Sequence, residues 1–133
     1  MSKIVNWGHW VVAALFAAWG LDSLWRAVVG FPSLFRQHPS DITYHVVSDA
    51  FLWVAVLACA WGIFKWRPWA HTLGIVLSAF FAVAMGLVFA VGSQSGTKPN
   101  PYFAPTILIV CTVLIWLVLP AVRAEYRRRS IAA

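Results

Sequence analysis

Residues Trp69–Val91 read WAHTLGIVLSAFFAVAMGLVFAV and contain no Asp, Glu, Lys or Arg. A helix rises about 1.5 Å per residue, so this stretch would be about 35 Å long, enough to cross a hydrocarbon core of about 30 Å. Lipid offers no water to the backbone, so a crossing segment of this kind forms its hydrogen bonds within a helix. The stretch therefore predicts a transmembrane helix and identifies lipid as the solvent in which the chain folds.

Three further apolar runs of similar length lie on either side of this stretch. Together with it, the expected spans are roughly 7–29, 46–64, 69–91 and 103–122. Hydrophobic residues make up 62% of the chain and charged residues 11%, compared with about 25% charged in soluble domains. The loops are too short to fold alone. Residues 1–133 are therefore expected to form one all-α integral membrane domain, an up-down-up-down antiparallel bundle of four transmembrane helices.

The chain carries 10 Lys and Arg residues against 4 Asp and Glu residues, a net charge of +6. With four spans, seven of the basic residues fall on the side of the two termini and three on the other side. Cytoplasmic segments are enriched in Lys and Arg, which predicts cytoplasmic termini. The expected location is the bacterial cytoplasmic membrane. Basic residues that flank spans also meet anionic lipid, so the predicted partner is the bilayer and not nucleic acid.

Tryptophan and arginine mark the expected membrane boundaries. Trp is enriched at the level of the headgroups, and Arg in the cytoplasmic flanks of spans. The residues assigned to membrane anchoring on this basis are Trp7, Trp10, Trp66, Trp69, Arg127, Arg128 and Arg129.

Small residues recur at every fourth position of the third span. The stripe consists of Gly74, Ser78, Ala82, Gly86 and Ala90. Helices in lipid associate through small residues that allow close backbone approach. The stripe therefore predicts a helix-packing face, used either inside the bundle or in self-association.

One polar constellation is expected at the outer end of the first two spans. Asp22 and Arg26 are four residues apart on the first span, and Asp49 lies about one turn inside the second. Charged residues in a span normally face the bundle interior and pair. A buried ion-pair network of Asp22, Arg26 and Asp49 is the structural interpretation. Alternatively, Arg26 and Asp41 extend to the outer headgroups.

The same region also offers a functional interpretation. Helical spacing places Asp41, His45 and Asp49 on one face, with His38 about one turn earlier. Imidazole and carboxylate groups are ligands for zinc or copper, so these four residues form a candidate metal site. They could instead carry protons, because imidazole and a buried carboxylate titrate near neutral pH. The spacing is generic and does not identify a reaction.

Two further histidines, His9 and His71, lie at similar levels near the inner ends of the first and third spans. A bis-histidine haem site is the cofactor alternative at this level. It is disfavoured because both histidines lie beside interfacial tryptophans, where an unligated histidine is ordinary. No other cofactor is expected from the sequence.

The outline resembles small bacterial four-span proteins, in which an opening such as Arg67-Pro68-Trp69-Ala70 is common. This resemblance implies a fold type and no activity. The small multidrug exporters have a similar size and a carboxylate in their first span. The spacing of Asp22 and Arg26 and the one-sided charge bias both depart from that pattern.

No catalytic set is recognisable in the sequence, so catalytic residues are not assigned and an enzyme is disfavoured. The favoured function is a non-catalytic accessory or scaffold subunit of a larger membrane complex or of a homo-oligomer. One alternative is a membrane enzyme or metal-binding protein that uses the outer His/Asp cluster. Another is a small proton-coupled transporter that uses Asp22 and Asp49.

Overall fold

The computed structural model describes residues 3–37, 42–96 and 101–132, and it describes their side chains except those of residues 31, 34, 35, 37 and 42–49. All regular secondary structure in these ranges is helical. The chain divides into two compact units, Met1–Lys65 and Trp66–Ala133. Each unit is built around one pair of long helices and is described by itself.

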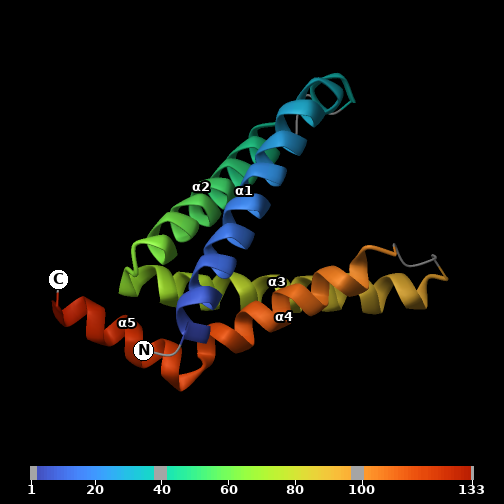
Figure 1. Ribbon diagram of the computed structural model, residues 1–133. Helices are drawn as coiled ribbons and strands as arrows, with labels where there is room; N and C mark the ends of the chain where they lie inside the picture. Colours follow the sequence, from blue (N-terminus) through green and yellow to red (C-terminus); the bar gives the residue numbers. More distant parts are fainter. Residues whose placement is uncertain (1–2, 38–41, 97–100, 133) are drawn as a thin grey trace. The chain divides into compact units, whose positions relative to one another are not determined.

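The first unit is a helical hairpin. Helix α1 spans Lys3–Gln37 and helix α2 spans Ile42–Phe64, and the two lie side by side and antiparallel (Figure 1). Gly20 of α1 marks a close approach, because a Cβ atom built there would lie 2.6 Å from Cδ2 of Leu57. Such contacts let helices pack without a hydrophobic driving force. Helix α1 also extends beyond the expected span, through Pro32 to Gln37.

The second unit contains α3 (Pro68–Gln94), α4 (Phe103–Val118) and α5 (Pro120–Ala132). Helix α3 begins where the sequence predicts, because Arg67 is extended (φ −75°, ψ 130°) and Pro68 occupies the first turn. A residue before proline avoids the helical region, and proline suits the first helical position. Helices α3 and α4 lie side by side (Figure 1), and α5 contacts both of them.

The helix of the fourth expected span is interrupted near its inner end. It was expected to reach Val122, but α4 ends at Val118, and α5 leaves it at an angle of 57°. The physical reason is Pro120, which has no backbone N–H and would clash with the preceding turn of a continuous helix. Leu119 adopts an extended conformation between the two helices (φ −53°, ψ 132°).

Two helical segments among the described residues are long and apolar enough to cross a membrane. They are Lys3–Gly30 and Pro68–Gln94, and a third is added if α4 and α5 count as one bent span. In α2, the segment Ala50–Phe64 is apolar but shorter. The protein is thus an all-helical chain with two or three candidate spans, and the four-span bundle remains a prediction.

Two glycines of α1 provide a matched test of hairpin packing. Gly20→Leu should lower the free energy of unfolding by about 1–3 kcal/mol, because the new side chain must displace Leu57. Gly30→Leu should have no such cost, because a Cβ atom at Gly30 meets none of the described atoms within 4 Å. Both substitutions gain helix propensity, so unfolding in detergent micelles isolates the packing effect. Equal stability of the two variants would contradict the close approach.

Candidate functional site

A buried histidine joins α3 to the end of α4. Nε2 of His71 donates to the backbone carbonyl of Leu117 at 2.7 Å, and the His71 side chain is buried. Leu117 lies in the last turn of α4, where carbonyl groups lack a partner within the helix. We call this pair the His71 clamp. It supplies a donor to a helix end that would otherwise be unsatisfied in an apolar environment.

The first unit repeats this arrangement. Nε2 of His9 donates to the carbonyl of Phe64, the last residue of α2, at 3.2 Å. His9 is buried, and we call this pair the His9 clamp. In each unit, a histidine near the start of the first long helix binds the end of the following helix. The available sequence signal is the repeated Trp-small-His triplet, Trp7-Gly8-His9 and Trp69-Ala70-His71.

The clamps determine which histidine tautomers are present. A carbonyl oxygen can only accept a hydrogen bond, so Nε2 of both His9 and His71 carries a hydrogen. Neither Nε2 atom is then presented to a metal. Nε2 of each histidine is therefore used in helix-end binding, and the haem alternative remains untested.

An acidic residue on the inner face of α5 forms an ion cluster within the helix. Glu125 accepts hydrogen bonds from Arg128 (Nε at 3.1 Å, Nη2 at 2.9 Å) and from Nε of Arg129 at 2.7 Å. The Glu125 side chain is 8% exposed. The hydrogen bonds from Arg128 and then Arg129 hold the pKa of Glu125 below its ordinary value.

Trp66 connects this ion cluster to the His71 clamp. The Arg129 guanidinium lies 4.1 Å from the centre of the Trp66 ring. The Tyr126 ring lies 5.0 Å from Trp66 and 4.7 Å from His71. Trp66 has a φ of 56°, a left-handed conformation that bulky residues rarely adopt. These contacts fix α5 against the start of α3.

The residues assigned to membrane anchoring therefore divide into two groups. Trp66 and Arg129 bind within the second unit, with Arg129 contacting Glu125 and Trp66. The other members are exposed, namely Trp7, Trp10, Trp69, Arg127 and Arg128, although Arg128 also donates to Glu125. The sequence could not separate the groups, because the difference depends on the bend between α4 and α5.

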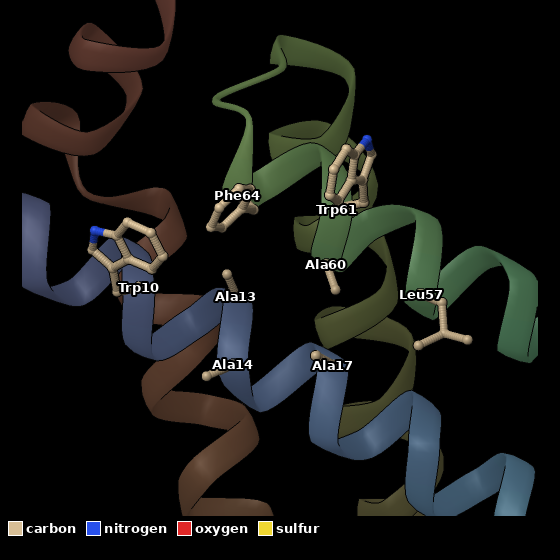
Figure 2. Close-up of a pocket in the computed structure, with 8 residues that line it drawn as sticks. All are labelled: Trp10, Ala13, Ala14, Ala17, Leu57, Ala60, Trp61 and Phe64. Atoms are coloured by element: carbon tan, nitrogen blue, oxygen red, sulfur yellow. The ribbon is translucent and has the colours of Figure 1, made fainter.

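A groove opens between α1 and α2 in the first unit (Figure 2). Its volume is about 400 Å³. Trp10 and Phe64 lie at one end, where their rings meet edge to face at 4.9 Å. We call it the alanine groove, and its lining residues are Trp10, Ala13, Ala14, Ala17, Leu57, Ala60, Trp61 and Phe64.

No protein-family model, curated protein or solved structure matches this chain.

Only part of the predicted ion-pair network lies among the described side chains. Nε of Arg26 lies 2.8 Å from Oδ2 of Asp22. The two side chains are 78% and 53% exposed, respectively, so this pair does not have the burial that was expected. It forms between successive turns of α1. The side chain of Asp49 lies outside the described residues, so its part in the network remains a prediction.

The candidate metal site falls largely outside the described structure. His38 and Asp41 are not among the described residues, and the side chains of His45 and Asp49 are not described. Among the side chains that are described, no group of three or more His, Cys, Asp or Glu residues could hold a metal ion. Zinc or copper binding by the outer cluster therefore remains untested.

The small-residue stripe of α3 becomes more exposed along the helix. Gly74 and Ser78 are buried and Ala82 is half-buried, whereas Gly86 and Ala90 are exposed. A Cβ atom at Gly86 would meet none of the described atoms within 4 Å. The half of the stripe near the start of α3 is thus packed, and the other half is open.

The His71 clamp can be tested by a substitution that retains the ring. His71→Phe should preserve most of the contact with Tyr126 but leave the Leu117 carbonyl without its donor. An unsatisfied buried acceptor costs about 1–3 kcal/mol, and this loss should appear in unfolding by sodium dodecyl sulfate titration. Thr72→Ala, at an exposed neighbouring position, is the control. Equal stability of His71→Phe and the parent protein would show that the clamp contributes nothing.

The Glu125 cluster predicts a pH-dependent position of α5. Because the folded-state pKa lies below the ordinary value of 4.5, the stabilisation is complete above pH 4.5 and is lost as pH falls through the folded-state pKa. Spin labels at Thr72 and Ala132, both exposed, should therefore give a broader distance distribution in acid. Glu125→Gln should give the broad distribution already at pH 7. A distribution independent of both changes would argue against the cluster.

Proposed function

We propose that this protein is a small polytopic membrane protein that acts as a non-catalytic docking subunit. The proposed activity is to bind one transmembrane helix of a partner subunit in the alanine groove. The groove is the observation that carries this proposal, because its lining consists of alanine methyl groups, one leucine and aromatic rings. Such a lining suits an apolar partner better than a polar substrate.

The sizes of the lining residues favour a helix as the occupant. Ala13, Ala14, Ala17 and Ala60 provide most of the small surface between α1 and α2. Small residues allow the backbone of another helix to approach closely, which is the main source of helix association in lipid. Ala14 is exposed and Ala17 half-buried, so part of the lining remains accessible. A lipid acyl chain is the competing occupant.

The proposal includes a topology. We propose four spans, with α2 as the second and α4 as the fourth, and with both termini in the cytoplasm. Helix α2 contains 23 residues, enough for a hydrocarbon core of about 30 Å. The seven-to-three distribution of basic residues supports this orientation in a bacterial cytoplasmic membrane. The alanine groove then lies in the cytoplasmic half of the membrane.

Site-specific photo-crosslinking in native membranes tests the occupant. Benzoylphenylalanine at Ala14 should form an adduct with a transmembrane peptide of another membrane protein or of a second copy of this chain. The same probe at Ala18 is the matched control, because Ala18 is exposed on α1 and does not line the groove. Ala17→Trp should fill the groove. With an overpacking cost of about 1–3 kcal/mol, this change should reduce the Ala14 adduct by about tenfold or more.

Two results would overturn the docking function. One is an Ala14 probe that forms adducts only with lipid. The other is a protein adduct that forms equally from positions 14 and 18 and persists in Ala17→Trp, because it would then not depend on the groove.

A further inference from the structure

The two faces of α5 have opposite chemistry. Val122, Glu125 and Tyr126 are buried, whereas Arg123, Arg127 and Arg128 are exposed. An open hollow of about 490 Å³ lies over the exposed face. We call this surface the arginine face, and its lining residues are Pro120, Arg123, Ala124, Arg127 and Arg128.

The arginine face begins where the apolar part of the chain ends. Helix α4 stops at Val118, and α5 starts at Pro120 after a bend of 57°. The four arginines of α5 make this helix unsuited to hydrocarbon. A strongly basic helix directly after an apolar one lies at the membrane–water boundary, where lipid phosphates are concentrated.

The contacts within α5 separate structural arginines from available ones. Arg129 donates to Glu125 and lies over Trp66, so it holds the helix in place. Arg128 also binds Glu125, although its side chain is 69% exposed. Arg123 and Arg127 form no ion pair with the described residues. Their guanidinium groups therefore remain available to an external anion.

We propose that the arginine face binds the phosphate headgroup of an anionic glycerophospholipid. Guanidinium groups recognise phosphate through paired N–H donors and remain charged at every physiological pH. The hollow places Arg123 and Arg127, one helical turn apart, on the same surface. The location next to α4 favours a lipid phosphate over a free one. This proposal does not depend on the alanine groove.

Lipid binding by the full-length protein in neutral detergent micelles tests the site. The probes are fluorescent phosphatidylglycerol and phosphatidylcholine with identical acyl chains. Phosphatidylglycerol should bind more tightly. Arg123→Gln and Arg127→Gln should each weaken its binding about fivefold, and the double variant about 25-fold. Arg36→Gln removes an exposed arginine of α1 and should leave binding unchanged.

Helix content by circular dichroism should be the same in all of these variants, because Arg123 and Arg127 do not contact the core. Equal affinity for the two lipids would overturn the proposal, as would full binding by the double variant. Complete displacement of phosphatidylglycerol by millimolar inorganic phosphate would assign the arginine face to a free anion. It would thereby also overturn the lipid assignment.

Discussion

Carbonyl groups at the end of an apolar helix need a hydrogen-bond donor that lipid cannot supply, and both helical hairpins of this protein meet that need with a histidine. His71 binds the end of α4 and His9 binds the end of α2. An imidazole suits this role because its apolar ring can be buried while one N–H reaches the carbonyl. Each bond joins the start of one helix to the end of the next. It therefore limits how far the two helices can slide along each other.

In the second unit, contacts between α5 and the start of α3 reinforce this constraint. Pro120 ends α4 one turn after the carbonyl that His71 binds, and the bend brings Tyr126 onto the His71 ring. Tyr126 and Arg129 then contact Trp66, whose left-handed backbone is retained by these contacts. The position of α5 therefore depends on the hydrogen bond at the end of α4 and on the bend at Pro120. The arginine face remains exposed because the opposite face of α5 is buried within the second unit.

The helices were predictable where local composition determines them. Uninterrupted apolar runs and Pro68 placed α3 within one residue of its observed start, and Phe103 was correctly expected to begin α4. The end of α4 was not predicted, because Ala121 and Val122 continue the apolar pattern beyond Pro120. Hydropathy does not reveal that proline lacks the backbone N–H group that a continuous helix requires. The clamps were missed because their acceptors are backbone carbonyls, which have no residue signature. His9 and His71 were therefore considered only as unligated histidines at the membrane interface or as haem ligands.

Because each clamp lies within its own hairpin, membrane insertion can proceed in two self-contained steps. The His9 clamp needs nothing beyond Phe64, so the first hairpin can close while the ribosome is still translating the second. Synthesis adds about 5–20 residues per second, so the first hairpin would be complete several seconds before the second. The same independence would allow the two halves of the gene to be expressed separately, with each product retaining its own clamp.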